Sequence, residues 1–192
     1  TSADKKGNST VFDQDEFIKG NSTLEKLSTL KPAFRKIGGT VTAGNASGIN
    51  DGAAAMLLAS DAAVKKYGFI PKGRIVASSV VGVEPRIMGI GPVNASKKAL
   101  EKAGLALSDI DLFEFNEAFA AQAIAVSKGL GLDMAKTNPN GGAIALGHPV
   151  GCSGAFIATK AIYELHRTGG KYALVTMCIG GGQGIAVVFE RL

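Results

Sequence analysis

Three residues with chemically versatile side chains lie where predicted elements of the chain meet. Asn116 follows the apolar segment 111–115, His148 lies in the glycine-rich segment GGAIALGHPVG, and Cys178 ends the apolar segment KYALVTMCI. Carboxamide, imidazole and thiol groups can serve catalysis, and imidazole and thiol groups can also bind a metal. Because ligands sit beyond the carboxyl ends of strands in open α/β sheets, we expect the three side chains to meet in one crevice.

Each of these residues also has a structural explanation. Asn116 is of a type that commonly caps helices, a lone histidine such as His148 is more often structural than catalytic, and Cys178 alone is typical of a small buried apolar side chain. The glycines around His148 argue against packing alone, because glycine costs conformational entropy and gives a core little to bury. The joint position of the three residues at strand ends, two of them beside glycine clusters, favours a shared functional site.

A metal site is the first alternative for this pattern. His148, Cys152, His166 and Cys178 would supply four ligands. Zinc sites usually present their ligands in tight pairs, and Pro149 interrupts the first pair here, so we expect no bound metal. A phosphate-binding loop is a weaker alternative, since GHPVGCSG lacks both the G-K-[ST] ending and the dinucleotide fingerprint.

The composition favours an α/β protein with a sizeable core. The chain has 192 residues, of which 46% are hydrophobic and 6% aromatic, with 26 glycines and no tryptophan. Such an abundance of small residues favours close backbone packing. The net charge of +5 comes without a long basic run, which argues against a nucleic-acid partner and fits a phosphorylated small molecule.

The cysteine count and the apolar patterning bear on the compartment. Two cysteines argue against a disulfide framework and favour a reducing compartment. No apolar stretch approaches the roughly 18 residues of a membrane span, and we expect no membrane partner. The closing FERL shows no peroxisomal tripeptide, so we expect a cytoplasmic location, with mitochondria and peroxisomes as the open alternatives.

From Arg74 onwards the pattern predicts alternating strands and helices in the order βαβαβαββ. Continuous apolar runs predict buried strands, whereas apolar residues three or four apart, closed by glycine, predict helices. Right-handed crossovers would build a five-stranded mixed, mostly parallel sheet flanked by helices, with an antiparallel closing strand after the turn GGGQG. The expected strands are 74–83, 111–115, one before the helix 153–166, 171–179 and 184–192, and the other helices are 92–104 and 116–130.

The amino-terminal part has a different character. Residues 1–39 are polar and lack periodicity, which predicts loops with one short helix. After the loop GGTVTAGNASGINDG, a helix is predicted over about 51–68. One face of that helix would carry the apolar residues Met56, Leu57, Ala63, Val64 and Tyr67.

Four motifs, in this order, resemble the carboxyl-terminal half of a thiolase: TVTAGNASGINDGAAA, NEAFAAQ, NGGAIALGHPVGCSGA and CIGGGQG. The resemblance runs from about Lys31 to the end and is greatest for the acetyl-CoA acetyltransferase (acetoacetyl-CoA thiolase) type. It implies an acyltransferase that condenses two acetyl-CoA molecules, or thiolyses a 3-ketoacyl-CoA, through an acyl-cysteine intermediate. Coenzyme A thioesters would be its substrates, and no cofactor would be permanently bound.

By motif, the resemblance assigns catalytic roles to four residues. His148 would take the proton of a nucleophilic cysteine and then donate a hydrogen bond to the thioester oxygen, while Asn116 would hold a water that donates to the same oxygen. Cys178 would remove the α-proton of the incoming acetyl group, or return it in the reverse direction. The backbone N–H of Gly180 would form part of a second oxyanion hole, and the glycines beside His148 would let the thioester approach closely.

The same resemblance implies a set of residues that line the substrate. Ala43, Gly44 and Ser47 match the segment along the pantetheine arm, whose amides Ser47 can hydrogen-bond. The acyl end is matched by Met88, Ala118 and Phe119. Packing is the competing explanation for every member of this set other than the glycine.

The chain departs from the family pattern in two respects. The family's nucleophilic cysteine belongs to an amino-terminal half, and neither Cys152 nor Cys178 occupies its motif. We therefore expect this chain alone to be inactive. Phe156 stands where the pattern GCSGAR puts arginine, which questions a local polar contact without touching the chemistry.

The resemblance divides the chain into three parts. Residues 1–50 would form the end of a loop region with the CoA-lining segment, 51–72 a helix that packs on the missing amino-terminal half, and 73–192 the thiolase carboxyl-terminal domain. Alone, the chain should expose apolar surface, so we expect it to need that half as a partner or to self-associate as a homodimer or homotetramer. The alternative function is a non-catalytic acyl-CoA-binding or structural fragment with the thiolase fold.

Overall fold

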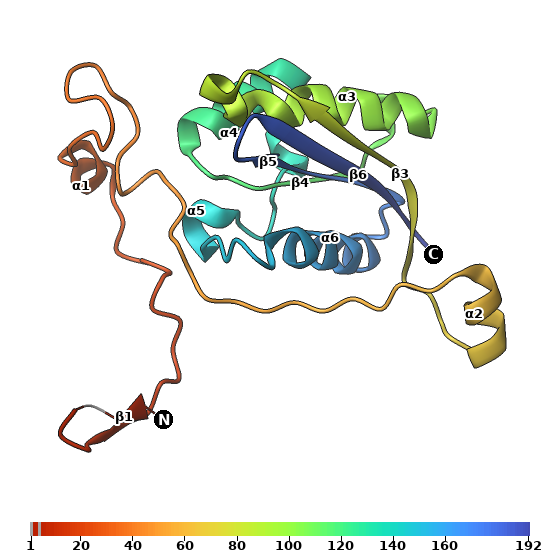
Figure 1. The fold of residues 1–192 in the computed structure, drawn as a ribbon, viewed down its shortest axis with the longest axis horizontal. Coiled ribbons are helices and arrows are strands. Elements are labelled where there is room, and N and C mark those ends of the chain that lie inside the picture. Colours follow the sequence, from red (N-terminus) through yellow and green to blue (C-terminus); the bar gives the residue numbers. More distant parts are fainter. Residues whose placement is uncertain (1, 4) are drawn as a thin grey trace.

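The computed structural model describes residues 2–3 and 5–192, which form a mixed α/β body with a long amino-terminal arm (Figure 1). The strands are β1 (Ser2–Ala3), β2 (Ser9–Thr10), β3 (Gly73–Gly82), β4 (Leu112–Phe115), β5 (Tyr172–Ile179) and β6 (Gln183–Arg191). The α-helices are α1 (Leu24–Ser28), α2 (Asp61–Tyr67), α3 (Gly91–Ala103), α4 (Ala120–Leu130), α5 (Ala143–Leu146) and α6 (Ser153–Thr168). Three short 3₁₀ helices complete the set: η1 (Pro85–Ile90), η2 (Leu107–Asp109) and η3 (Met134–Lys136).

The central sheet has four strands in the order β3-β6-β5-β4. β4 and β5 are parallel, whereas β6 is antiparallel to both of its neighbours, β3 and β5. The mixed α/β architecture and the antiparallel β5–β6 pair are therefore as predicted. The expectation of five strands is wrong, and β6 lies inside the sheet between β3 and β5.

The fifth predicted strand is reduced to one β-bridge between Thr137 and Phe113. The next residue, Asn138, replaces strand pairing with its side chain: the Phe115 N–H donates to Asn138 Oδ1, and Asn138 Nδ2 donates to the Phe115 carbonyl, both at 3.0 Å. Asn138 is the one non-glycine residue with positive φ (46°) among the described residues. Pro139 follows and has no N–H to donate, which disfavours the continuation of a strand there.

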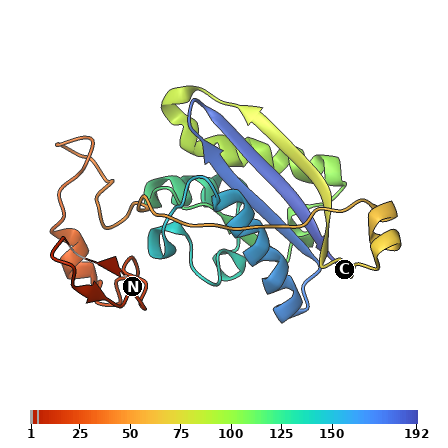
Figure 2. The same cartoon turned by 60° about the horizontal axis from the view of Figure 1, so that its bottom comes forward.

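Helices cover both faces of the sheet, with α3 and α4 on one side and α5 and α6 on the other (Figures 1 and 2). Leu112 belongs to the apolar cluster under α6, and the next residue, Phe113, to the cluster under α3. β4 is therefore buried on both faces, as its continuous apolar run predicts. Truncation of a fully buried side chain such as Leu165 would cost about 2–5 kcal/mol.

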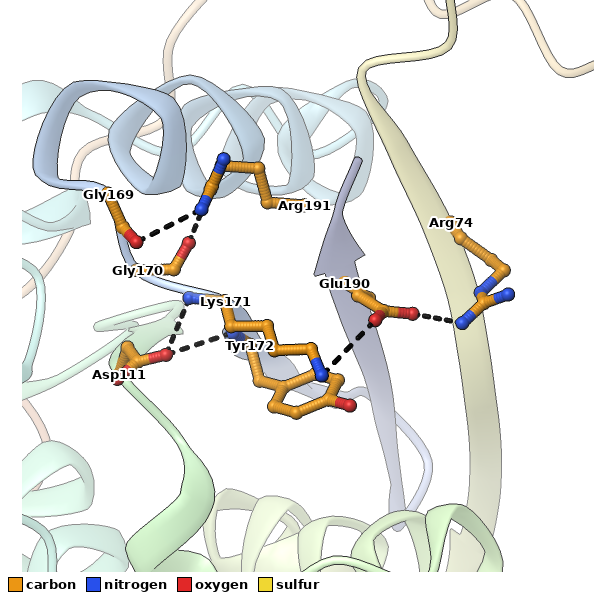
Figure 3. Close-up of polar contacts among 8 residues, drawn as sticks. All are labelled: Arg74, Asp111, Gly169, Gly170, Lys171, Tyr172, Glu190 and Arg191. Carbon is orange, nitrogen blue, oxygen red and sulfur yellow. Dashed lines mark hydrogen bonds and ion pairs between the residues drawn. The ribbon is translucent and has the colours of Figure 1, made fainter.

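The sheet end where β3, β4 and β5 begin is closed by polar contacts (Figure 3). Asp111 Oδ2 accepts hydrogen bonds from the backbone N–H groups of Lys171 (2.6 Å) and Tyr172 (3.0 Å). Glu190 forms an ion pair with Arg74 and has Lys171 Nζ at 3.7 Å. We call these five residues the ion-pair end of the sheet.

The arm that precedes β3 lies along the outside of the body in both views (Figures 1 and 2). The predicted helix over 51–68 is wrong in its first half, because residues 51–60 are extended and α2 begins at Asp61, capped by the Ser60 hydroxyl and closed by Gly68. Leu57 and Leu58 are exposed. An amphipathic pattern forms a stable helix mainly when its apolar face can pack, and these side chains contact no core cluster.

Apolar side chains are exposed along the arm, as predicted, and include Val11, Phe12, Ile37, Ile49 and Leu57. None of the helices in the described part of the chain is both long and apolar enough to cross a membrane.

Candidate active site

The carboxyl ends of β4 and β5 lie side by side and bring Asn116 next to the end of β5. The Asn116 N–H donates to the Thr176 carbonyl at 3.0 Å, which extends the parallel ladder one residue beyond β4. Asn116 is only 2% exposed. It does not cap a helix, because α4 begins at Ala120 with Phe119 as its N-cap. The capping explanation for Asn116 is therefore wrong.

His148 is held by a turn whose backbone only glycine adopts easily. Gly147, at φ 98°, precedes it, and a Cβ at Gly147 would lie 2.5 Å from Asn50 Oδ1. The His148 N–H donates to both Gly48 O and Asn50 Oδ1, each at 3.2 Å. The glycine-rich segment and the loop 43–50 are therefore fastened to each other at the histidine.

The imidazole of His148 has a polar partner at each ring nitrogen. Nε2 lies 3.2 Å from Asn116 Nδ2, and Nδ1 lies 2.7 Å from Ser153 Oγ. The Ser153 hydroxyl donates its only proton to the Pro149 carbonyl at 2.9 Å, so it must accept from Nδ1–H. Nε2 is then the unprotonated nitrogen and accepts from the Asn116 amide. These partners assign the Nδ1–H tautomer.

Burial sets the charge state of the two titratable groups at these strand ends. Burial lowers the pKa of His148, so the ring is neutral at neutral pH and can accept a proton at Nε2. Burial raises the pKa of the Cys178 thiol, which is therefore protonated at rest. Cys178 pairs with Gly184 in the β5–β6 ladder, and among the described residues it has no hydrogen bond to His148 or Asn116. We name Asn116, His148, Ser153 and Cys178 the site end of the sheet.

The geometry separates the ligands of the zinc alternative. His166 lies near the carboxyl end of α6, where its Nε2 is 2.7 Å from the Lys72 carbonyl oxygen. The rise of an α-helix places it about 20 Å from Ser153, which contacts His148. The two histidines cannot share one ion.

The loop that contains Ser47 pairs with the segment after Asn116. The Ser47 N–H donates to Ala118 O at 2.9 Å, and Ala46 forms an antiparallel bridge with Phe119. Ser47, Ala118 and Phe119 are thus neighbours, although they come from distant parts of the sequence. Gly44 packs closely against α1 and the residues that follow it, since a Cβ at Gly44 would lie 2.5 Å from the Leu27 and Leu30 side chains.

Three further residues of the predicted site lie apart from the contacts of His148 and Asn116. Ala43 is exposed at the start of the same loop, and Met88 is half-buried in η1, which contacts α4 and β5. Gly180 is exposed after β5, with open space on the side where a Cβ would point. No hydrogen bond joins these three to His148 or Asn116 in the described part of the chain.

Sequence reasoning missed several residues that hold the site. The sequence pattern marks Ser153 only as the start of a helix, yet this residue sets the tautomer of His148. Asn138 positions the segment after β4 and donates to Glu117 Oε1 at 2.7 Å. The Asn-Pro dipeptide at 138–139 is a turn signal that marks this position, but it does not reveal the partner.

Comparisons with known proteins agree along most of the chain. Residues 69–191 match the family described as "Thiolase, C-terminal domain", and residues 1–62 match "Thiolase, N-terminal domain". Beta-ketothiolase BktB of Cupriavidus necator is 57% identical over 188 residues, 98% of this chain and 48% of that protein. The mitochondrial 3-ketoacyl-CoA thiolase of Homo sapiens is 58% identical over 186 residues, 97% and 46% of the two chains.

Solved structures show the same likeness. The acetyl-CoA acetyltransferase of Bacillus anthracis superposes with a TM-score of 0.91 at 52% identity, covering 95% of this chain and 46% of that one. Human mitochondrial 3-ketoacyl-CoA thiolase in complex with CoA gives a TM-score of 0.87 at 52% identity, covering 94% and 46%. The chain spans about half the length of the curated relatives it matches.

Proposed function

Because the chain belongs to the thiolase family, we propose that it supplies one part of an active site that transfers acyl groups between coenzyme A thioesters. The observation that carries the proposal is the contact of 3.2 Å between His148 Nε2 and Asn116 Nδ2 at the carboxyl ends of the strands. This contact gathers an unprotonated nitrogen and an amide donor at one point. Such a pair can accept a proton and then stabilise an oxyanion.

The first half-reaction begins with a cysteine thiol outside the segments described above, in the amino-terminal part of the complete enzyme. His148 Nε2 takes the thiol proton, and the thiolate attacks the thioester carbonyl. As the acyl-cysteine forms, the coenzyme A thiolate leaves and takes the proton of Cys178, which becomes a thiolate. The tetrahedral oxyanion of this step lies against the backbone N–H of Gly180. Neither Cys152 nor Cys178 fills the nucleophile's role in this scheme.

The second half-reaction uses the protonated His148 and the buried thiol. Cys178, as a thiolate, removes the α-proton of the incoming acetyl group, and the enolate oxygen accepts from His148 Nε2–H and from a water held by Asn116. The enolate carbon attacks the acyl-cysteine, which releases the nucleophilic thiolate and forms a 3-ketoacyl-CoA. Thiolysis runs through the same steps in reverse. Because burial disfavours the Cys178 thiolate, it forms only when Cys178 gives its proton to the departing coenzyme A thiolate of the first half-reaction.

In this proposal the substrate lies along the surface formed by the loop 43–47 and the segment 118–119, which are paired with each other. Ser47 hydrogen-bonds the pantetheine amides, Ala43 and Gly44 line the arm, and the acyl end meets a wall of Met88, Ala118 and Phe119. Acetyl and acetoacetyl groups are the proposed acyl groups. Coenzyme A thioesters are substrates in this scheme, and no permanently bound cofactor takes part.

A reconstitution experiment tests the proposal. The chain is mixed with a separately produced amino-terminal half of a thiolase, and thiolysis of acetoacetyl-CoA is measured beside a longer 3-ketoacyl-CoA. We expect activity in the mixture and none in either part, with acetoacetyl-CoA turned over faster. A mixture that forms a complex yet shows no turnover would favour the alternative of an acyl-CoA-binding or structural fragment. Light scattering on the same samples shows whether a homodimer or homotetramer of the complete enzyme forms.

A further inference from the structure

A buried carboxylate lies directly behind the proposed site. Glu114 is in β4, two residues before Asn116, and is 1% exposed. Desolvation raises its pKa to about 7, and Lys160 is the group that lowers it most. Burying an ionised carboxylate destabilises the fold unless a partner compensates its charge, so the partner of Glu114 determines how stable this part of β4 is.

That partner is Lys160 on α6. Its Nζ lies 3.0 Å from Glu114 Oε2, and its side chain is 15% exposed. Apart from this ion pair, neither Glu114 oxygen has a hydrogen-bond partner among the described residues. The same ammonium donates to the carbonyl of Gly141, in the glycine-rich segment that leads to His148. One side chain thus joins the segment of Asn116 to the segment of His148.

The surroundings of the Lys160 ammonium also indicate that it joins the segments of Asn116 and His148. Phe156 lies one helical turn before Lys160, and its ring centroid is 5.7 Å from Nζ. Both residues line a small pocket together with Asn116, Gly147 and Ser153. Because residues four apart share a helix face, a cation at position 156 would face this same pocket. In this chain that position is apolar, and the charge comes from the next turn of α6.

We propose that Lys160 is a positioning residue, which holds β4 and the glycine-rich segment at the spacing that lets His148 meet Asn116. The proposal rests on the proposed function for its catalytic consequence, but its structural part concerns this chain alone. A second contact also holds the chain near the glycine-rich segment against α6, since Asn140 Nδ2 donates to Glu164 Oε2 at 2.9 Å. The Lys160 side chain does more than the Asn140–Glu164 hydrogen bond, because it also neutralises the buried carboxylate of Glu114.

The structural part is tested by NMR of the isolated chain, which contains only two histidines. We expect the Hε1 resonance of His148 to move or broaden in Lys160→Met, while that of His166, at the far end of α6, stays unchanged. Lys160→Arg and the double variant Phe156→Arg/Lys160→Met should restore the His148 resonance. Lys97→Met, at an exposed position on α3, is the control for loss of one charge. An unchanged His148 resonance in folded Lys160→Met overturns the proposal, as does failure of both cation-restoring variants.

The ion pair itself is tested by urea unfolding between about pH 5 and pH 9. Glu114 has its pKa raised in the folded state, so its stabilising contribution is present at low pH and is lost as pH rises to about 7. Lys160 lowers that pKa, whereas Glu117 and Glu164 raise it. In Lys160→Met, the loss should continue above pH 7, and Glu114→Gln in that background should abolish it. Identical pH profiles for the wild-type chain and Lys160→Met would contradict the pairing.

The catalytic consequence is measured in the reconstituted enzyme. Lys160→Met should lower kcat about tenfold or more with KM little changed, because the pairing of Ser47 with Ala118 does not depend on Lys160 while the histidine is misplaced. Phe156→Arg/Lys160→Met should recover most of kcat. If the NMR and unfolding results hold but the wild-type mixture has no activity, the proposed function fails and the structural part stands. If wild-type activity is normal and Lys160→Met keeps its kcat, the positioning proposal fails.

Discussion

The two ends of the central sheet differ in how their polar side chains are exposed and paired. At the ion-pair end, Glu190 is flanked by two basic side chains, Arg74 and Lys171, which are 63% and 60% exposed, and Asp111 accepts from two backbone N–H groups (Figure 3). Glu190 is itself buried, but its two basic partners reach water and neutralise it. This end holds the strands in place and contains no shifted histidine or cysteine among the described residues.

At the site end, polar groups are buried and their states are constrained. His148 has a pKa lowered by burial and a tautomer set by Ser153. Next to these residues, Asn138 adopts a positive φ that is uncommon for a residue with a side chain, and Glu114 in β4 has a single ion pair. Folding alone does not favour such features, and they concentrate where function requires them. The difference between the ends is the reason why we propose the site end as the catalytic end.

Replacement of His148 should lower activity more than any other substitution considered, and it tests the contrast between the two ends most directly. In the reconstituted enzyme, His148→Ala should lower kcat about 10³-fold or more, because both the proton acceptor and an oxyanion donor are lost. The unfolding free energy should change little, since the ring is only half-buried. Thiolysis rates and urea unfolding of the same samples measure both. A loss of only a few-fold would remove His148 from the mechanism.

A smaller loss is expected when the orienting hydroxyl is removed. Ser153→Ala leaves His148 Nδ1 without its acceptor, so the Nε2–H tautomer becomes competitive and fewer molecules hold a basic Nε2. We expect kcat to fall about tenfold, which corresponds to a hydrogen bond worth about 1.4 kcal/mol. ¹⁵N chemical shifts of the ring report the tautomer directly. Unaltered ring shifts in Ser153→Ala would show that the hydroxyl does not select the tautomer.

Asp111 is the residue of the ion-pair end that should matter most. Asp111→Ala leaves the Lys171 and Tyr172 N–H groups without their acceptor, and we expect about 1 kcal/mol of destabilisation, limited because water can replace the carboxylate. The kcat of the reconstituted enzyme should stay unchanged within a factor of about two. Chemical denaturation and steady-state kinetics give the two values. A kcat loss as large as that of Ser153→Ala would erase the distinction between the two ends.

Arg74 should give the smallest effect. Its guanidinium pairs with Glu190 but is largely exposed, and Lys171 remains near the same carboxylate. We expect Arg74→Ala to cost about 0–1 kcal/mol, less at high salt, with no change in activity. Unfolding at low and high salt tests this. A loss of several kcal/mol of unfolding free energy would contradict the view that the ion pairs of the ion-pair end contribute little.

The sequence by itself determined the local features of this protein. The continuous apolar runs gave β3, β4, β5 and β6 nearly to the residue, and glycines marked the ends of α3 and α6. Asn116 stands out because it follows an apolar run and His148 because it lies in a glycine-rich segment, and the structure brings the two into contact. These successes have one cause: burial and backbone conformation impose patterns on neighbouring residues. The catalytic roles of Asn116, His148, Cys178 and Gly180, and the roles of the substrate-lining residues, stay predictions.

Only the tertiary structure decided which distant groups meet. β6 lies between β3 and β5, an arrangement set by hydrogen bonds between residues more than a hundred positions apart in the case of β3. Asn138 completes a ladder that a strand was expected to fill, and residues 51–60 stay extended because no surface packs against their apolar side. The pairing of Glu114 with Lys160 has the same origin. Periodicity reports which face of an element is apolar, but the partner of that face depends on the whole fold.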